Sequence, residues 1–512
     1  MENDKRLVLI VMLTVLVSGC ATVRPQDNYS QASAMIRART GSDDVYDPSS
    51  ESEVIQKVNK LLEGGLTAEE AVSVALLNNK AFQSQFQEIG VSRAELVQSG
   101  LLTNPTLMLS ARFPEGGGRS NLAFGLAQDL MEIWQLPVHK RIARDQLEQA
   151  VMTVVHSAVD LAAQVKIAYC QLCVVQENEK VVAENVALLK RSADLAESRF
   201  NAGESTILDL NLVRSDVLQG MINLESARRD AKVNAAALEH LLGLAADQAE
   251  VNLVDTLPSS AEPIPDDQAL IELAWKTRLD VRVASLDMDT AAREIQRQRR
   301  AALPGVSLGI EAERTEMRAP RSLKPPASEF DFTNPSQALQ DYALQQFEAH
   351  RDRELEKSQN IDLLLGPSLE LTLPVFDQNR AQIAKARFQF AQKQKDYEEL
   401  LLEVVEEVRR AAATVRASQE LLRVSLQEAV PLAGKNVDTA QRMYEAGEET
   451  VLTLLLAQQN LNEQRQASIT VAGDYAVALA DLEKAVGGTL AGLPDQPPPQ
   501  GASSDNAKGA AR

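Results

Sequence analysis

The stretch Ala202-Gly203-Glu204-Ser205-Thr206-Ile207-Leu208-Asp209-Leu210 returns 244 residues later as Ala446-Gly447-Glu448-Glu449-Thr450-Val451-Leu452-Thr453-Leu454, with six of nine positions identical. The register between the two copies holds without a gap beyond this stretch. A second echo, at an offset of 199 residues, aligns Asn104-Pro105 with Leu303-Pro304. A unit that is used twice usually completes a symmetric object, so the chain is predicted to contain two copies of one structural unit.

The segment that leads into the first stretch has the pattern of a very long helix. Residues 138–200 contain neither proline nor glycine, and apolar side chains recur at alternating steps of three and four, interrupted only by Glu179. This spacing predicts a coiled-coil-like helix of about 60 residues, roughly 90 Å long. The break at Asn201-Ala202-Gly203 is expected to reverse the chain, and a second helix to return to Leu242-Gly243.

Each copy is also predicted to begin with a shorter helix. A hydroxyl cap at Thr67, with Glu70 three residues on, opens one that runs towards Leu102, and the second copy has its counterpart over residues 266–301. Pro137 is expected to mark the end of the connection before the first long helix. The second long helix, over residues 378–444, is predicted to kink at Pro431, whose ring removes a backbone hydrogen bond.

Four short segments alternate between apolar residues and small or polar ones. They cover residues 106–113 and 121–126 around the Gly116-Gly117-Gly118 turn, and 306–313 and 365–373 in the second copy. This period of two predicts β-strands. Strands of about ten residues with an apolar face have the length needed to cross a bilayer at a tilt. Four strands cannot close a membrane barrel, so several chains are expected to share one.

The N-terminus has the features of an export signal. Lys5-Arg6 precede an apolar run that is too short to span a bilayer, and Leu16-Val17-Ser18-Gly19-Cys20 resembles the lipobox of bacterial lipoproteins. The resemblance implies cleavage before Cys20, which would carry a diacylglycerol and an N-acyl chain (palmitate) as its only covalent group, with no other cofactor. Ala21, in place of an aspartate, points to the outer membrane. An ordinary secretory signal with a chance cysteine is the alternative.

The composition excludes several classes of function. A formal charge of −20 over 512 residues argues against nucleic acid as a partner. Four scattered histidines, with no zinc-protease, phosphate-loop or nucleophile-elbow motif, predict that the chain is not an enzyme. Cys170 and Cys173 share one helical face, and without a second pair they are interpreted as packing residues instead of a metal site, with a disulfide as the alternative.

The lipobox, the doubled helix–hairpin–helix unit and the paired glycine tips together resemble the TolC-type outer membrane efflux family, over roughly residues 67–487. The resemblance implies an α+β membrane protein: a trimer with a 12-stranded outer-membrane β-barrel, four strands per chain, continued by a long periplasmic α-helical barrel. It implies a passive exit duct of a tripartite efflux pump in a Gram-negative bacterium. The chain would assemble as a homotrimer, and its other partners would be a periplasmic membrane-fusion adaptor and an inner-membrane transporter of the RND type.

The same resemblance implies roles for residues at the two tips. The expected adaptor-docking positions are Gly203, Glu204, Gly447 and Glu448, and the entrance-gating candidates are Asp209, Tyr444 and Glu449. Asp209 and Tyr444 match the family's aspartate and aromatic, but Glu449 stands where the family has an arginine. The family's acidic constriction positions fall on Thr453 and Leu456, so gating by the same ion pairs is in doubt. No metal site is predicted.

The resulting domain organisation follows the repeats. It comprises a signal peptide (1–19), a polar, turn-rich lipid-anchored linker (20–66), a first efflux repeat (67–250), a linker (251–265), a second efflux repeat (266–487) and a disordered tail (488–512). An insertion at about 316–360 is expected outside the cell, as a variable loop or a lid. The competing hypothesis is a lipid-anchored periplasmic coiled-coil scaffold without a pore. The substrate, whether heavy metal, drug or solvent, is left open.

Overall fold

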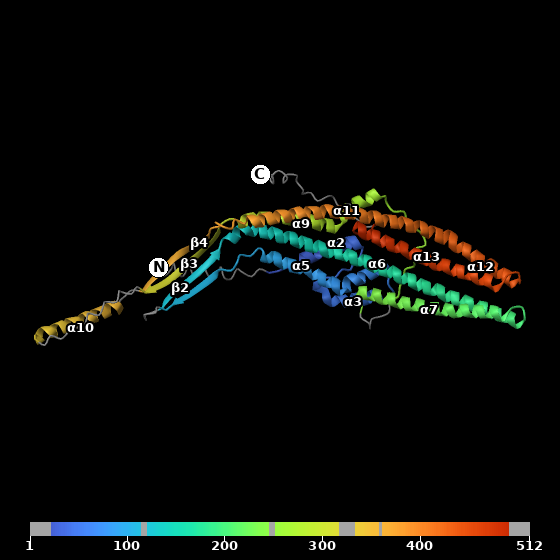
Figure 1. Ribbon diagram of the computed structural model, residues 1–512, viewed down its shortest axis with the longest axis horizontal. Helices are drawn as coiled ribbons and strands as arrows, with labels where there is room; N and C mark the ends of the chain where they lie inside the picture. Colours follow the sequence, from blue (N-terminus) through green and yellow to red (C-terminus); the bar gives the residue numbers. More distant parts are fainter. Residues whose placement is uncertain (1–21, 114–119, 245–250, 317–332, 358–360, 491–512) are drawn as a thin grey trace. The chain divides into compact units, whose positions relative to one another are not determined.

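The computed structural model describes residues 22–113, 120–244, 251–316, 333–357 and 361–490. The signal peptide, Cys20, the Gly116-Gly117-Gly118 turn and most of the tail lie outside them. In chain order the elements are α2 (Gln26–Thr40), η1 (Pro48–Ser50), α3 (Glu51–Leu62), α4 (Ala68–Asn78), α5 (Lys80–Gln98), β1 (Thr106–Arg112), β2 (Asn121–Asp129), α6 (Met131–Asn201), α7 (Ile207–Leu242), α8 (Asp267–Thr277), α9 (Leu279–Ala301), β3 (Gly305–Glu316), α10 (Pro335–Lys357), β4 (Ile361–Thr372), α11 (Arg380–Val424), η2 (Ser425–Ala429), α12 (Val430–Glu445) and α13 (Val451–Val486) (Figure 1).

The described chain divides into two compact units. One is helical and draws on residues 1–97, 143–291 and 389–512; the other holds the sheet and draws on residues 98–142 and 292–388. Each sequence repeat contributes to both units, with helices in the first and a pair of strands in the second. The repeats and the compact units therefore divide the chain in different ways.

The sheet has four antiparallel strands in the order β1-β2-β3-β4. Its register places apolar residues opposite one another across all four strands: one such row is Leu107, Leu126, Ile310 and Pro367. Most residues between these rows are small, polar or acidic, with Met108 and Leu364 as exceptions. The predicted alternation and the pairing within each hairpin are confirmed, and β1 and β4 are the two edges of the sheet.

The long predicted helices are present, with two differences at prolines. The expected end of the connection at Pro137 is wrong, because α6 already begins at Met131 and includes the proline. Arg300 Nη1 donates to the Trp134 carbonyl at 2.8 Å there, a tertiary contact that supports this early turn. Before Pro431 the chain forms a π-helical segment, Ser425–Ala429. The structure thus has a π turn just before Pro431, whereas the kink itself stays a prediction.

The apolar seam predicted along α6 lies inside the helical unit. Most of its positions are buried; the fully buried ones include Ala158, Val165 and Leu172. α6 is also the only described helix with a window apolar and long enough to cross a membrane, and half of that window is buried in the protein. The seam therefore serves helix packing, as its three-and-four spacing predicts.

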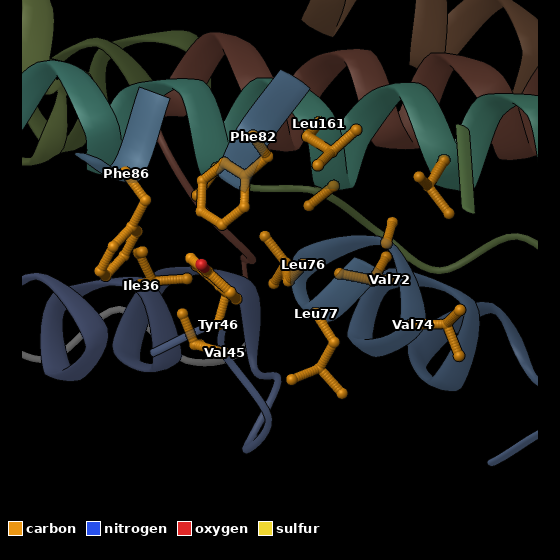
Figure 2. Close-up of a cluster of buried hydrophobic side chains, with 14 of the residues drawn as sticks. Ile36, Val45, Tyr46, Val72, Val74, Leu76, Leu77, Phe82, Phe86 and Leu161 are labelled. Atoms are coloured by element: carbon orange, nitrogen blue, oxygen red, sulfur yellow. The ribbon is translucent and has the colours of Figure 1, made fainter. Parts of the chain in front are cut away.

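Residues 26–62 differ most from their prediction. Instead of a polar, turn-rich leader they form α2 and α3, which place Tyr29, Ile36 and Val54 in the same core as α4, α5 and α6. Figure 2 shows Ile36, Tyr46 and Phe86 facing one another in this cluster. Tyr29 stacks on Phe86 with ring centroids 5.4 Å apart. The buried positions of α2 keep helical spacing, but three of the five, Ala32, Ser33 and Thr40, are small or polar, so the sequence shows little hydrophobic contrast between the two faces.

The short helices predicted over 67–102 and 266–301 are each split in two. The capping box at Thr67 and Glu70 is confirmed, but the helix breaks at Asn79, and its counterpart breaks 199 residues later at Arg278. In both copies the residue at the break contacts the C-terminal end of the return helix, α7 in the first copy and α13 in the second. Asn79 Nδ2 donates to the Leu241 carbonyl at 2.9 Å, and Arg278 Nη1 to the Ala485 carbonyl at 3.2 Å. These bonds satisfy carbonyls that a helix end leaves unpaired.

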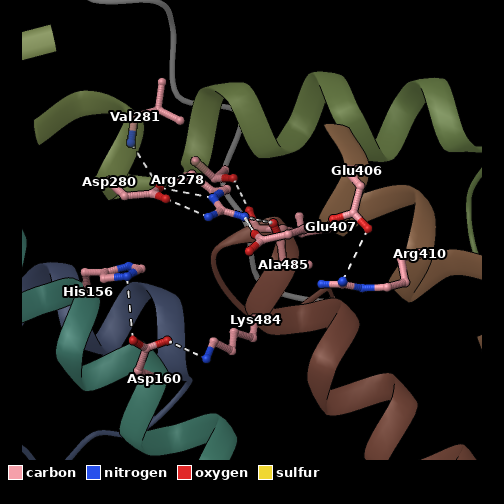
Figure 3. Close-up of polar contacts among 12 residues, drawn as sticks. His156, Asp160, Arg278, Asp280, Val281, Glu406, Glu407, Arg410, Lys484 and Ala485 are labelled. Atoms are coloured by element: carbon pink, nitrogen blue, oxygen red, sulfur yellow. Dashed lines mark hydrogen bonds and ion pairs between the residues drawn. The ribbon is translucent and has the colours of Figure 1, made fainter. Parts of the chain in front are cut away.

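Arg278 also anchors a charged network in the second copy, shown in Figure 3. Its guanidinium lies between Asp280, at 2.6 Å, and Glu407. Burial alone would lower the pKa of Arg278, but the hydrogen bonds that its guanidinium donates to the two carboxylates more than offset burial and raise that pKa. Burial likewise tends to raise the pKa of Asp280, whereas the contacts with Arg278 lower it overall.

Candidate functional site at the two helical tips

The repeat stretches fold into two tight helix–turn–helix tips with the same backbone hydrogen bonds. At the first, Gly203 N donates to Phe200 O at 3.0 Å and Glu204 N to Arg199 O at 2.9 Å; the second tip repeats both bonds 244 residues later. This is the Schellman arrangement that ends a helix on a left-handed residue. Gly203 and Gly447 have φ of 78° and 76°, a region that glycine enters without steric cost.

The two tips differ where the next helix begins. Thr206 caps α7 in a capping box with Asp209, whose carboxylate accepts from the Thr206 amide at 3.0 Å and from its hydroxyl at 2.8 Å. These hydrogen bonds lower the pKa of Asp209. In the second tip the corresponding position is Thr453, and its hydroxyl donates to Glu449 Oε2 at 2.9 Å. The carboxylate of Asp209 therefore lies within the first turn of α7, whereas that of Glu449 lies before the start of α13.

Below the turns, the ends of four helices pack on a common core. Its residues come from α6, α7, α12 and α13 and are Leu189, Ala196, Leu210, Val213, Ala440, Tyr444, Val451, Leu454 and Leu455. Polar residues bridge the copies as well: Gln458, 2% exposed, donates through Nε2 to Ser192 Oγ at 3.1 Å. The two tips of one chain are thus joined to each other.

Another link between the tips comes from Arg199, a residue that the sequence analysis did not single out. Arg199, in the last turn of α6, donates from Nη1 to the Tyr444 carbonyl at 2.8 Å. Its guanidinium carbon also lies 4.7 Å from the centre of the Tyr444 ring, a cation–π geometry. The available signal was a difference between the repeats, because Met443 occupies the place of Arg199 in the second copy.

The predicted site residues fall into two groups. Gly203, Glu204, Gly447 and Glu448 are exposed at the turns, as a docking surface requires. The gating candidates are not brought together: Tyr444 is buried beneath Arg199, and the hydrogen bonds given above engage Asp209 with Thr206 and Glu449 with Thr453. Their role as a latch stays a prediction.

The two cysteines of α6 are free thiols, Cys173 buried and Cys170 partly so. Burial raises the pKa of Cys170 to about 11 and that of Cys173 to about 12, so both are neutral at physiological pH. Within the described ranges, no group of three or more His, Cys, Asp or Glu side chains could hold a metal ion. Cys173 belongs to the hydrophobic core of the helical unit, which fits the interpretation as a packing residue.

Comparison with known proteins identifies the family. The family model of the outer membrane efflux protein matches residues 71–244 and 270–488, most of the chain. The chain belongs to the outer membrane efflux protein family. The cobalt-zinc-cadmium resistance protein CzcC of Cupriavidus metallidurans is 23% identical over 430 residues, 83% of this chain and 90% of the relative. The outer membrane protein TolC of Vibrio cholerae is 21% identical over 421 residues, 81% and 87% of the two chains.

Solved structures share the fold. CusC superposes with a TM-score of 0.64 at 17% identity, covering 85% of this chain and 92% of CusC. The outer membrane protein VceC of Vibrio cholerae gives 0.61 at 16% identity, covering 85% and 97%. The family and fold class predicted from the sequence are confirmed. This efflux protein is an outer-membrane duct of a Gram-negative bacterium, with its helical part in the periplasm.

Proposed function

We propose that three copies of this efflux protein form one passive duct across the outer membrane and periplasm. The observation that carries the proposal is the four-stranded sheet with an apolar face and two edges, β1 and β4, that no other described strand pairs. In lipid each unpaired backbone group costs several kcal/mol, so such a sheet must close on itself or on other chains. Three copies supply twelve strands, within the range of known membrane barrels.

The two faces of the sheet support this arrangement. The row Leu109, Phe124, Ala312 and Leu365 belongs to one face, which suits the hydrocarbon of a membrane. The alternate residues on β3 and β4 include Glu311 and Glu370, which suit a water-filled lumen. In a water-soluble scaffold this apolar face would be exposed to water, which is unfavourable, so the duct is favoured over the scaffold.

The tips are proposed as the docking surface for a periplasmic membrane-fusion adaptor, which would connect the duct to an inner-membrane transporter of the RND type. Gly203 and Gly447 shape the two turns, and Glu204 and Glu448 stand exposed beside them. Two similar turns per chain would give six around a trimer. We propose that the duct carries out no catalytic step and that the transporter selects the substrate.

Cys20 is proposed as a second attachment to the outer membrane. A single chain of lipid anchors a protein weakly, whereas the two groups proposed here would act together with the barrel. Radiolabelled palmitate should enter the wild-type protein and not a Cys20→Ser variant. Labelling of the variant would exclude Cys20 as the acceptor, whereas the barrel proposal would be unaffected.

Purified full-length protein in planar bilayers tests the proposed duct. We expect detergent-dependent extraction, a trimer by mass and discrete single-channel conductance. A water-soluble monomer without conductance would support the periplasmic scaffold instead.

A further inference from the structure

At one end of the sheet the chain passes from strands into helices. The strands β1 and β3 begin at this end, and β2 and β4 finish there. The segments 131–142, 292–304 and 373–388 adjoin this end and belong to the same compact unit as the sheet. Together they contain nine Lys and Arg but three Asp and Glu, a formal charge of +6, whereas the whole chain carries −20. Positive charge is thus concentrated beside the strand ends.

Hydrogen bonds bring the three segments together. The bond from the Arg300 guanidinium to the Trp134 carbonyl joins the end of α9 to the beginning of α6. Asn379 Nδ2 donates to the Gln298 carbonyl at 2.7 Å, which joins α9 to the residue that precedes α11. The cations of the three segments therefore lie around one end of the sheet, although the segments are far apart in the sequence.

Most of these cations face solvent without a carboxylate beside them. Seven of the nine are exposed, namely Lys140, Arg141, Arg299, Arg300, Arg380, Lys385 and Arg387. Within the described part of the chain none of these seven pairs with a carboxylate, in contrast to Arg297, which pairs with Glu294 at 2.6 Å. Burial and the nearby guanidinium of Arg141 lower the pKa of Arg293, as expected where cations approach one another. The positive charge of this surface is therefore not neutralised within the chain.

Exposed apolar side chains lie at the same end of the sheet. Trp134, five residues after β2, is 59% exposed, and Phe376, four residues after β4, is fully exposed. Leu303, two residues before β3, is 55% exposed. Tryptophan is enriched where a membrane meets water, and clustered Lys and Arg beside a membrane segment attract anionic headgroups. Both features of this surface therefore suit a lipid headgroup region.

We propose that this surface is a basic collar, formed by residues 131–142, 292–304 and 373–388, that binds anionic phospholipid headgroups of the periplasmic leaflet. This rests on the proposed function, in which the sheet crosses the outer membrane. The apolar face of the strands lies in hydrocarbon, so the exposed cations just beyond the strand ends meet the phosphodiester groups.

Charge complementarity selects an anionic lipid as the occupant. A zwitterionic lipid would cover Trp134 and Phe376 but would leave the cations of the collar without a net counter-charge. The rest of the chain is strongly acidic, and the same headgroups would repel it. Attraction is thereby confined to the collar, which sets the depth of the duct in the membrane.

The two tryptophans of the chain make lipid contact at the collar measurable. In full-length trimers that carry Trp275→Phe, Trp134 is the only indole. These trimers are reconstituted in vesicles of phosphatidylcholine and phosphatidylglycerol, with each lipid in turn brominated on its acyl chains. Quenching of the Trp134 fluorescence then gives the relative binding constant of the two lipids at this site.

We expect phosphatidylglycerol to be preferred roughly 2- to 5-fold, up to the effect of about one cation beside an anionic surface. Salt at about 1 M should abolish the preference, because the Debye length falls to about 3 Å. Arg299→Gln combined with Arg380→Gln should remove it. Arg299→Lys combined with Arg380→Lys should keep it, since a point charge is sufficient for this attraction.

The matched control is Arg409→Gln combined with Lys435→Gln. Both residues are exposed cations of the helical unit, so this double variant removes the same charge away from the collar. It should keep the preference for phosphatidylglycerol. Three results would overturn the collar: equal binding of both lipids to the wild-type site, a preference that persists in the glutamine variant of the collar, or an equal loss in the control.

The design also separates the collar from the duct. If the trimers conduct but neither lipid quenches Trp134, the collar fails and the proposed function stands. If the protein neither inserts nor conducts, the proposed function fails. Should the glutamine variant of the collar not assemble, the salt dependence of the parent trimer carries the test, and a preference that persists at about 1 M salt would contradict an electrostatic collar.

Discussion

At the scale of single residues, the tip glycines act through backbone conformation alone. A Cβ added at Gly203 would meet nothing within 4 Å, so substitution creates no clash. The strain comes from φ, and a residue with a side chain pays about 1–2 kcal/mol for the left-handed region. We expect Gly203→Val and Gly447→Val to distort the turns and to impair efflux in cells while trimers persist.

Gly434 provides the opposite case as a control. It lies inside α12, where an added Cβ also meets open space. Gly434→Ala should stabilise the helix by about 1 kcal/mol, because alanine is the better helix former. Normal efflux in both tip variants would contradict the role given to the turns.

Arg278 lets stability be predicted as a function of pH. The carboxyl of Asp280 has a lowered pKa in the fold, so its contribution is present above the unfolded value of about 3.9 and is lost as pH falls through the lowered one. Arg278→Met should cost about 2–4 kcal/mol at neutral pH, less than for a fully buried pair because Asp280 and Glu407 are partly exposed.

The variant should also lose the acid sensitivity of this pair. Without Arg278 the Asp280 carboxylate is stranded, so protonation below pH of about 4 relieves it instead of destabilising the fold. Thermal unfolding in detergent from pH 7 to 3 measures both effects. Arg423→Met, which removes an exposed pair with Glu420, is the control and should leave the curve almost unchanged. Parallel pH profiles for wild type and Arg278→Met would contradict the linkage.

At the scale of elements, the two faces of a strand predict different effects on assembly when neighbouring residues are replaced by arginine. Ile310 belongs to the apolar face of β3 and Glu311 to the other face. Arginine on the lipid face of a membrane strand costs about 2–4 kcal/mol at the bilayer midplane. We expect Ile310→Arg to reduce the amount of trimer in the outer membrane, whereas Glu311→Arg should assemble and shift ion selectivity towards anions. Equal assembly of both variants would contradict the assignment of faces.

Elements with a strict period were predictable from the sequence, whereas breaks between elements were not. The seam of α6 and the alternation in β3 recur over many residues, so both gave reliable predictions. The breaks at Asn79 and Arg278 depend on the carbonyls of α7 and α13, which are more than 150 residues away along the chain. The tips followed from their glycines, but Arg199 needed the distance to Tyr444.

At the scale of the whole molecule, the two repeats differ in side chains but keep the same helix breaks and tip turns. Asn79 and Arg278 serve one purpose with different donors, and the tip turns keep their backbone bonds although only one has an arginine beside it. Because both repeats share these breaks and turns, their backbones have the same geometry at these points. The divergence gives each chain a direction, from its first tip to its second, that a perfectly symmetric chain would lack.

The sheet edges lead to a prediction about assembly. In the order β1-β2-β3-β4 the edges are three strand spacings apart, about 14 Å within one chain, whereas a disulfide needs Cα atoms within about 7 Å. A cysteine at Ser110 of β1, combined in turn with one at each position from Leu364 to Leu369 of β4, should therefore cross-link only between chains. Denaturing gels should show covalent dimers and trimers only for the β4 positions whose side chains lie on the same face of the sheet as Ser110, which are every second residue. Cys170 and Cys173 should not interfere, because burial raises the pKa of both thiols. Cross-links confined to single chains would mean that the sheet closes on itself.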